Sequence, residues 1–150
     1  MENKMFCFQC EQTAGCTGCT GKAGVCGKSA DVANLQDELT GALIGLARAT
    51  DGDTPVSADT WLLLIEGLFT TVTNVNFNEK TIRELIDRVH AEKARLIPNC
   101  SACASHCGRN DDYNMAELWN AQEDVRSLKS LILFGVRGMA AYAHHALVLG

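Results

Sequence analysis

Apolar residues recur at three- and four-residue spacing over most of the chain beyond residue 30, which is the period of one face of an α-helix. This pattern predicts helices over residues 31–50, 57–73, 79–96 and from about 121 to 149. The expected inward-facing residues are Leu35, Leu39, Leu43 and Leu46 in the first helix, Trp61, Ile65, Leu68 and Val72 in the second, and Ile82, Leu85, Ile86 and Val89 in the third. Since no segment alternates with the period of a strand, the predicted fold is an all-α bundle of three to four main helices.

Polar residues predict where these helices begin and end. Ser57 and Asp59 are candidate N-caps of the second helix, and Pro98 is expected to end the third. Asn114-Met-Ala-Glu117 and Asn120-Ala-Gln-Glu123 both have the Asn-x-x-Glu spacing of a helix start. We therefore expect a helix to begin near each of these two asparagines.

The last predicted helix changes character along its length. Its first half is amphipathic, whereas residues 131–149 are apolar on nearly every side. Such a helix is expected to be buried on every side, and three partner helices do not easily surround it. The sequence thus predicts that the chain ends within a larger fold or meets a partner subunit. Its longest uninterrupted apolar run, Leu131 to Val136, is closed by Arg137 and is too short to cross a bilayer.

Length and charge narrow the class of protein. The chain has 150 residues, of which 47% are hydrophobic, which is enough for the core of one domain. With 13 Lys and Arg against 18 Asp and Glu, the net charge is −5, which argues against a general nucleic-acid-binding face. The first residues lack the apolar stretch of a secretory signal. We expect a cytoplasmic protein with neither a nucleic-acid nor a membrane partner.

Eight cysteines fall in two groups. Five lie between residues 7 and 26, namely Cys7, Cys10, Cys16, Cys19 and Cys26, and three between residues 100 and 107. In a reducing compartment such clusters hold metal or do redox chemistry more often than they form disulfides. Glycines at 15, 18, 21, 24 and 27 predict that residues 1–30 form an irregular loop. Residues 1–30 are therefore assigned as a cluster-binding loop and residues 31–150 as a helical bundle of the same domain, truncated at its C-terminus.

The spacing in the first group favours an iron–sulfur cluster over zinc. The two-residue gap between Cys7 and Cys10 lets adjacent thiolates reach one cluster, with the remaining ligands supplied by a loop that wraps back. A zinc ribbon separates its ligand pairs by about 12–20 residues, but only five separate Cys10 from Cys16. A thioredoxin-like motif would need a strand before it and a helix after it. The remaining alternative is a glycine-rich loop with incidental thiols.

Residues beside these cysteines suit the same chemistry. Phe6 and Phe8 flank Cys7 and are expected to exclude water from it. Lys22 and Lys28 are expected to supply positive charge near the negative thiolates.

Three segments then resemble a known signature. They are Met5-Phe-Cys-Phe-Gln-Cys-Glu-Gln-Thr-Ala-Gly15, Gly18-Cys-Thr20 and Gly24-Val-Cys-Gly-Lys28. They look like the N-terminal signature of the hybrid-cluster proteins, also called prismane proteins or hydroxylamine reductases, which are relatives of the nickel carbon monoxide dehydrogenases. Asn34-Leu-Gln-Asp37, Glu123-Asp-Val-Arg-Ser-Leu128 and Gly138-Met-Ala-Ala-Tyr-Ala-His144 agree with the same family. The resemblance spans nearly all of this chain but only the N-terminal portion of a family member.

The resemblance implies a ligand set. In the family, four cysteines of this signature hold a [4Fe–4S] cluster, or a [2Fe–2S] cluster in some members. They correspond to Cys7, Cys10, Cys19 and Cys26. Cys16 also stands in a Gly-Cys-Thr triplet and is supernumerary, and Cys19 ranks above it because the residues that follow fit better.

The second cysteine group and the histidines have no role assigned by the resemblance. Cys100-Ser-Ala-Cys103-Ala-Ser-His106-Cys107 is a compact set of soft ligands that either binds metal or forms an inter-helix loop with free thiols. His144 and His145 are adjacent on a helix and point roughly 100° apart, so we expect packing or surface roles for them rather than a joint site. His90 is expected on a solvated face.

The resemblance also implies a function. The family reduces hydroxylamine to ammonia and water with two electrons, at a hybrid iron–sulfur–oxygen cluster whose His, Glu and Cys ligands lie beyond this sequence. The chain is therefore predicted to be an electron-transfer module that receives electrons from a donor protein. It is expected to have no catalytic residue of its own. An oxidoreductase role is expected only together with the remainder of the enzyme or a partner subunit. The alternatives are a stand-alone ferredoxin-like or metal-binding module that docks to a partner subunit, and an inactive fragment.

Overall fold

The computed structural model describes residues 5–10, 18–50, 54–73, 75–97 and 111–150. Within these ranges there are five helices and no strand: α1 (Ala30–Ala49), α2 (Ala58–Thr70), α3 (Glu79–Leu96), α4 (Met115–Trp119) and α5 (Glu123–Leu149). The predicted all-α bundle of three to four main helices is confirmed, and α4 is one additional short helix. Pro98, predicted to end the third helix, lies outside the described residues.

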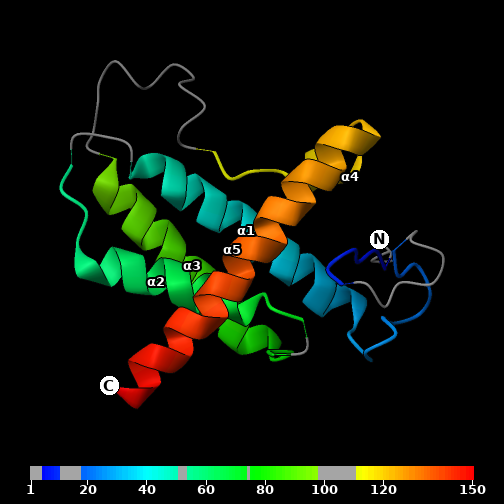
Figure 1. Ribbon diagram of the computed structural model, residues 1–150, viewed down its shortest axis with the longest axis horizontal. Coiled ribbons are helices and arrows are strands. Elements are labelled where there is room, and N and C mark those ends of the chain that lie inside the picture. The colour runs from blue at the N-terminus through cyan, green and yellow to red at the C-terminus, as the bar shows by residue number, and fades with distance from the viewer. Residues whose placement is uncertain (1–4, 11–17, 51–53, 74, 98–110) are drawn as a thin grey trace.

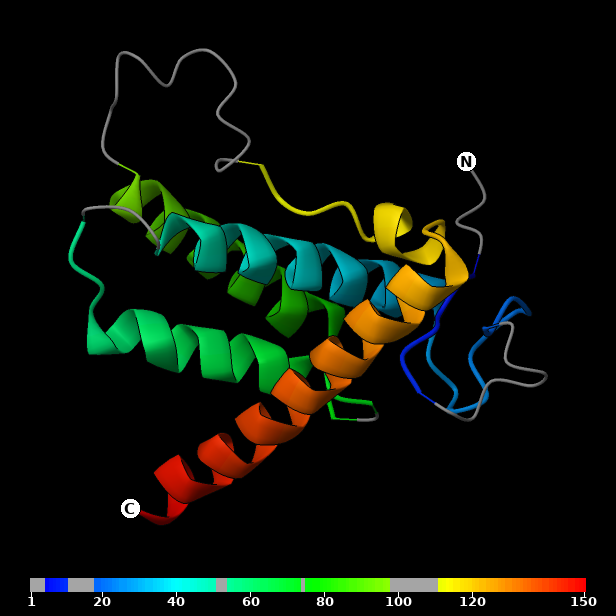
Figure 2. The ribbon, with the colours of Figure 1, turned by 45° about the horizontal axis from the view of Figure 1, so that its top comes forward.

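The core lies between α1 and its neighbours. Figures 1 and 2 show α1, α2 and α3 running alongside one another, with α5 crossing them obliquely. Leucines of α1 meet the apolar face of α3, and the buried set contains Leu35, Leu39, Leu43, Leu46, Ile82, Leu85, Ile86 and Val89. The inward faces predicted for the first and third helices are therefore confirmed, because both follow directly from the helical period.

The predicted inward face of α2 is wrong at Trp61 and correct at Leu68, which is partly buried and packs against the core. Trp61 is 51% exposed, and the buried residues of α2 are Thr60, Leu63, Gly67 and Thr70. The reason is close packing on α1, since a Cβ atom on Gly67 would lie 2.6 Å from the Cδ2 atom of Leu43. The apolar pattern alone predicts that the large apolar side chains of α2 face inward. Close contact with α1 instead leaves room only for glycine at residue 67.

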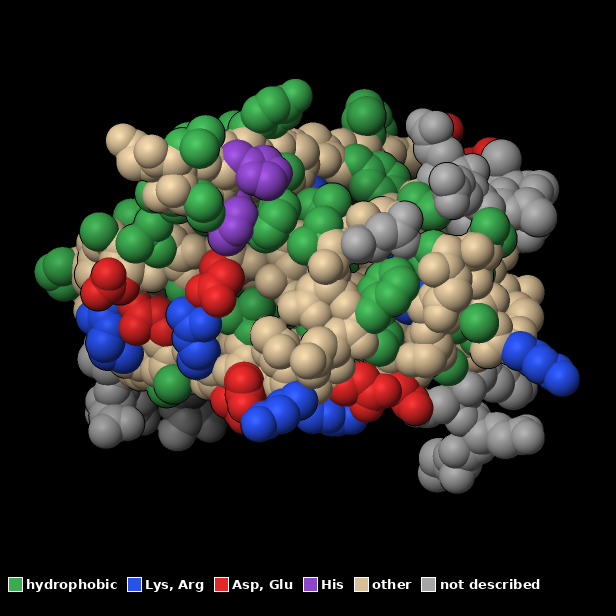
Figure 3. Space-filling view, turned by 90° about the horizontal axis from the view of Figure 1, so that it is seen from below, with side chains coloured by type: hydrophobic (Ala, Val, Ile, Leu, Met, Phe, Trp, Pro, Cys, Tyr) green, Lys and Arg blue, Asp and Glu red, His purple; other side chains and the backbone are tan. Residues whose placement is uncertain are grey.

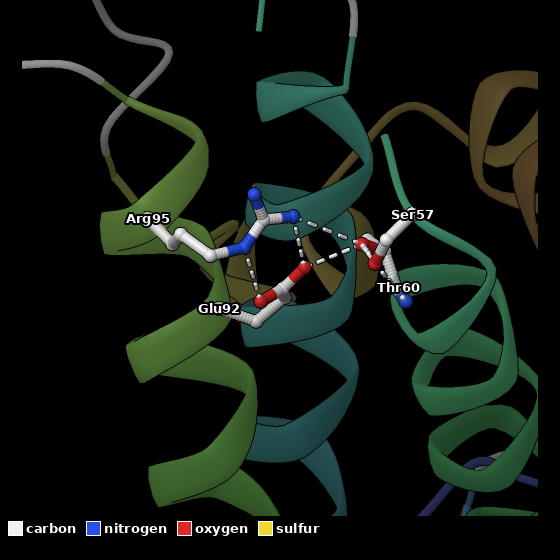
Figure 4. Close-up of polar contacts among 4 residues, drawn as sticks. All are labelled: Ser57, Thr60, Glu92 and Arg95. Carbon is white, nitrogen blue, oxygen red and sulfur yellow. Dashed lines mark hydrogen bonds and ion pairs between the residues drawn. The ribbon is translucent and has the colours of Figure 1, made fainter. Parts of the chain in front are cut away.

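A polar cluster joins the start of α2 to the end of α3 (Figure 4). Ser57 is the N-cap of α2, accepting a hydrogen bond from the backbone N–H of Thr60 at 3.3 Å. The Thr60 hydroxyl donates to Glu92 of α3, and Arg95 donates to both carboxylate oxygens of Glu92, at 2.9 and 2.7 Å. These hydrogen bonds, those from Arg95 foremost, hold the pKa of Glu92 below its usual range. Of the two predicted caps, Ser57 rather than Asp59 performs the role.

The two asparagine helix starts have different outcomes. Asn114 caps α4 by accepting from the backbone N–H of Ala116 at 3.0 Å, as predicted. Asn120 instead terminates α4, and α5 begins after Gln122, which makes no side-chain capping bond. A helix therefore begins near the second asparagine, as predicted, but Asn120 is the C-cap of α4 rather than the N-cap of α5.

Helix α5 exposes most of its apolar side chains. Only Ser130, Arg137 and Ala140 are buried, whereas Leu131 is 68% and Tyr142 is 83% exposed. Figure 3 shows hydrophobic side chains gathered over the upper part of one face, around two neighbouring histidines. The burial on all sides that the sequence predicts is thus not supplied by the described part of this chain.

Helix α5 is also the one described helix long and apolar enough to cross a membrane, judged by length and composition alone. The expectation that the protein has no membrane partner stays a prediction. Arg137, which closes the longest uninterrupted apolar run, is buried, with only 4% of its surface exposed. Its guanidinium donates to the Thr71 hydroxyl and to the Thr40 hydroxyl of α1, both at 2.9 Å.

Candidate functional site

The first cysteine loop closes on itself through a short backbone pairing. The N–H of Cys7 donates to the carbonyl of Cys19 at 3.1 Å, and the N–H of Cys19 donates to the carbonyl of Cys7 at 2.8 Å. Gly18, just before Cys19, has a φ of +85°, and a Cβ atom there would lie 3.0 Å from the Phe6 ring. Glycine at residue 18 therefore lets two distant parts of the cysteine signature lie side by side.

A tight turn carries Cys26. The N–H of Gly24 donates to the carbonyl of Lys28 at 2.8 Å, and the N–H of Gly27, at a φ of +85°, donates to the carbonyl of Gly24 at 2.9 Å. A Cβ atom on Gly24 would lie 3.4 Å from the sulfur of Cys26. The turn thus brings backbone close to this sulfur and directs the chain into Ser29, whose side chain caps α1.

Lys28 points into the protein beside Cys7. Only 1% of its surface is exposed. Its ammonium group donates to the side-chain carbonyl of Gln9 at 2.9 Å and to that of Gln36, and it lies 3.8 Å from the Cys7 sulfur. The positive charge predicted near the thiols is confirmed for Lys28, whereas Lys22 is exposed to solvent.

Aromatic side chains cover the cysteine loop on the side of α4. Phe6 and Phe8 both pack on Trp119 of α4, with ring centroids 5.9 and 5.7 Å apart. Cys7 is buried with Met5 and Ala33 as its neighbours, and exclusion of water by the two phenylalanines stays a prediction.

Asp37 of α1 joins this aromatic cover to the cysteine loop. One of its carboxylate oxygens accepts from Gln9 at 3.1 Å and the other from the Trp119 indole at 3.4 Å. Burial raises the pKa of Asp37 above its usual value, while these hydrogen bonds act in the opposite direction. Sequence reasoning did not assign a role to Asp37 or Trp119, although Asn34-Leu-Gln-Asp37 was one of the stretches that carried the family resemblance.

The four predicted ligands are free thiols within this loop. Cys7 is buried, and Cys10, Cys19 and Cys26 are partly buried. Desolvation raises the pKa of the Cys7 thiol, and the neighbouring Lys28 charge opposes that effect. The other four cysteines, Cys16, Cys100, Cys103 and Cys107, lie outside the described residues, as does His106.

The donor set consists of four free cysteine thiols in one loop, which is the kind of ligand set that iron–sulfur clusters take. Among the described residues no three His, Cys, Asp or Glu side chains converge closely enough to hold one metal ion. Buried or partly buried thiols, a loop rich in glycine and an adjacent ammonium group are suitable surroundings for such an anionic group.

The described histidines take no part in this loop. His90 is partly exposed, with its Nε2 atom 2.7 Å from a carboxylate oxygen of Asp112. His144 stacks on Phe69 of α2 with ring centroids 4.0 Å apart, and His145 meets the same ring edge-on. The packing or surface roles predicted for His144 and His145 are therefore confirmed. The expected solvated position of His90 is modified by its contact with Asp112.

Comparison with known proteins agrees with the cysteine signature. Residues 5–150 match the family described as the Prismane/CO dehydrogenase family. The chain belongs to this family. Among its relatives, proteins named hydroxylamine reductase from Clostridium perfringens, Porphyromonas gingivalis and Methanococcus vannielii are 40%, 39% and 35% identical to it, over 97%, 100% and 97% of this chain.

The chain spans about 30% of the length of each of these relatives. This coverage fits the expectation that the resemblance concerns the N-terminal portion of a family member. The names of the relatives indicate a family of oxidoreductases. The activity of those longer proteins is a proposal for this chain.

Proposed function

We propose that Cys7, Cys10, Cys19 and Cys26 hold a [4Fe–4S] cluster that receives and passes on single electrons in a hydroxylamine reductase-like protein. The observation that carries this proposal is the backbone pairing of Cys7 with Cys19 beside the buried ammonium group of Lys28. Four cysteines suffice to ligate such a cluster. Membership of the Prismane/CO dehydrogenase family supports the same assignment.

The cluster would supply one-electron storage, and the chain's own residues would supply its surroundings. The Phe6, Phe8 and Trp119 rings pack together beside the loop. Lys28 offsets negative charge at Cys7. A fixed positive charge favours retention of an anionic cofactor.

The proposed reaction is that of the named relatives. Hydroxylamine, two electrons and two protons give ammonia and water, so the module would deliver electrons to the reacting centre one at a time. We place that centre, the hybrid cluster, on ligands outside this chain. This placement is supported by the described histidines, which contact Asp112 and Phe69 rather than gather with cysteines.

The partners follow from the same proposal. Electrons would come from a donor protein in the cytoplasm. The remainder of the enzyme would cover the apolar face of α5, to which Leu131 and Tyr142 contribute. A second candidate function, favoured by the same exposed face, is a stand-alone ferredoxin-like module that docks to a partner subunit through α5.

Anaerobic reconstitution with iron and sulfide tests the cluster. The wild-type chain should take up about four irons and show thiolate-to-iron charge-transfer absorption, and Cys7→Ser or Cys10→Ser should lose both. A colourless or aggregated wild-type product would indicate an inactive fragment and refute the proposal. Reduction of hydroxylamine by the purified chain, supplied with a strong reductant, would contradict the placement of the catalytic centre elsewhere.

A further inference from the structure

The buried ammonium group of Lys28 has one feature that packing alone does not explain. A lysine ammonium has three N–H donors, and three acceptors surround this one: the side-chain carbonyls of Gln9 and Gln36, and the sulfur of Cys7. Two of these acceptors are neutral amides. The Cys7 sulfur is therefore the one acceptor of the three that can carry a negative charge.

In the described part of the chain no carboxylate contacts the ammonium group directly, and none of the ion pairs there includes Lys28. Asp37 is near enough for its charge and that of Lys28 to attract each other. Its oxygens accept from Gln9 and Trp119, however, so the Gln9 amide separates the two charges. Burying a cation costs free energy unless a compensating charge lies nearby. The location of the Lys28 ammonium group therefore matches an anionic centre at Cys7.

The ammonium group is also held firmly in place. Gln36 projects from α1, and its amide nitrogen donates to the backbone carbonyl of Asn76 at 2.8 Å. The backbone carbonyl of Gln9 accepts from the Thr73 hydroxyl at 3.0 Å. Two glutamines anchored to separate segments therefore fix the distance between the charge and the sulfur.

We propose that Lys28 is a positioning residue that raises the reduction potential of a cluster bound through Cys7. This inference rests on the proposed function. When an external one-electron donor reduces the cluster, one negative charge is added to the cluster and its thiolates, and no bond needs to form or break. A fixed cation stabilises the reduced state more than the oxidised state, and burial keeps salt from screening it.

Redox titration of the reconstituted full chain tests this proposal. Lys28→Met keeps much of the side-chain volume and removes the charge. At the wild-type midpoint potential, we expect the ratio of reduced to oxidised cluster to fall at least tenfold, which for one electron is a downward shift of about 59 mV. Lys22→Met is the matched control, since Lys22 is exposed, and it should leave the midpoint unchanged.

Salt dependence separates a buried charge from a surface effect. The difference between wild type and Lys28→Met should persist at high ionic strength, because the group is shielded from solvent ions. A difference that disappears in salt, or equal midpoints at equal iron content, would overturn the role of Lys28 and leave the cluster assignment standing. A wild-type chain that binds no iron would overturn both.

A second variant keeps the test decisive if Lys28→Met fails to retain iron. Gln36→Glu preserves the shape of the side chain and sets a carboxylate against the ammonium group, which neutralises it without removing Lys28. We expect a lower midpoint in this variant also. An unchanged midpoint in iron-loaded Gln36→Glu would refute the proposal.

Discussion

Arg137 of α5 donates a hydrogen bond to the hydroxyl of Thr40 in the middle of α1, across 2.9 Å and 97 residues of sequence. The same guanidinium donates to Thr71 after α2, so one side chain joins three segments. Desolvation lowers the pKa of Arg137 to about 10, with the negative charges of Asp37 and Cys7 acting against that change. The Thr40 hydroxyl donates in turn to the backbone carbonyl of Gln36 at 2.7 Å, which connects α5 to the surroundings of Lys28.

Replacing Arg137 should loosen α5 from the bundle. We expect Arg137→Met to reduce the free energy of unfolding by roughly 1–3 kcal/mol, because the hydroxyls of Thr40 and Thr71 lose a charged partner. Urea denaturation followed by circular dichroism measures this change. Arg83→Met on the exposed face of α3 is the control, and equal losses in the two variants would contradict the assigned role of Arg137.

Cys19 and Cys16 should differ in cluster binding. We expect Cys19→Ser to lose the charge-transfer absorption of the reconstituted chain, since Cys19 pairs directly with Cys7. Cys16→Ser should retain both absorption and iron content. The reverse pattern would mean that Cys16 is the third ligand.

Gly41 should tolerate no side chain. A Cβ atom there would overlap the backbone carbonyl of Tyr113, whose N–H donates to the Gly41 carbonyl at 3.1 Å. We therefore expect Gly41→Ala to destabilise the fold by about 1–3 kcal/mol in denaturant unfolding. Gly138→Ala on α5, where nothing lies within 4 Å of the new atom, should instead stabilise by up to roughly 1 kcal/mol through helix propensity. If Gly138→Ala lost as much stability as Gly41→Ala, the predicted contrast between the two glycines would be refuted.

Asp112 should make stability depend on acid pH. Partial burial acts to raise the pKa of Asp112, but hydrogen bonds from Lys93 and His90 outweigh it, and the pKa lies below the usual 3.8. A carboxyl whose pKa is lowered by folding stabilises the protein above its unfolded pKa, and this contribution is lost as pH falls through the lower folded value. We expect Asp112→Asn to cost about 0.5–1 kcal/mol near pH 6, and progressively less as the pH falls through the lowered pKa of Asp112. Asp87→Asn, at an exposed residue of α3, is the control, and a cost for Asp112→Asn that does not change with pH would contradict the ion-pair origin.

The apolar face of α5 should matter for assembly and not for folding of this chain. Leu131→Gln with Met139→Gln is expected to change the free energy of unfolding by less than about 0.5 kcal/mol, since both side chains are largely exposed. The same pair should weaken binding to a separately supplied polypeptide that carries the remainder of the family fold, measured by calorimetry. Leu62→Gln on α2 is the control, and unchanged binding by the α5 variant would exclude this face as the docking surface.

The helices were predictable to within a few residues because their signals are local. The period of Leu35, Leu39, Leu43 and Leu46 and the cap at Ser57 depend only on neighbours along one turn of helix. The cysteine signature was also readable, since Cys7 and Cys10 are separated by a spacing that ligand chemistry imposes. The family and the proximity of Lys28 to the thiols followed from that short segment.

Other features were decided between segments far apart in the chain. The inward face of α2 depends on how closely Gly67 approaches Leu43 of α1, and no helical period reports that distance. Arg137 interrupts an apolar run in the sequence, yet it is buried because Thr40 and Thr71 accept from it. Periodicity reports which residues share a side of one helix. Burial and partners depend on contacts that exist only after the helices have packed.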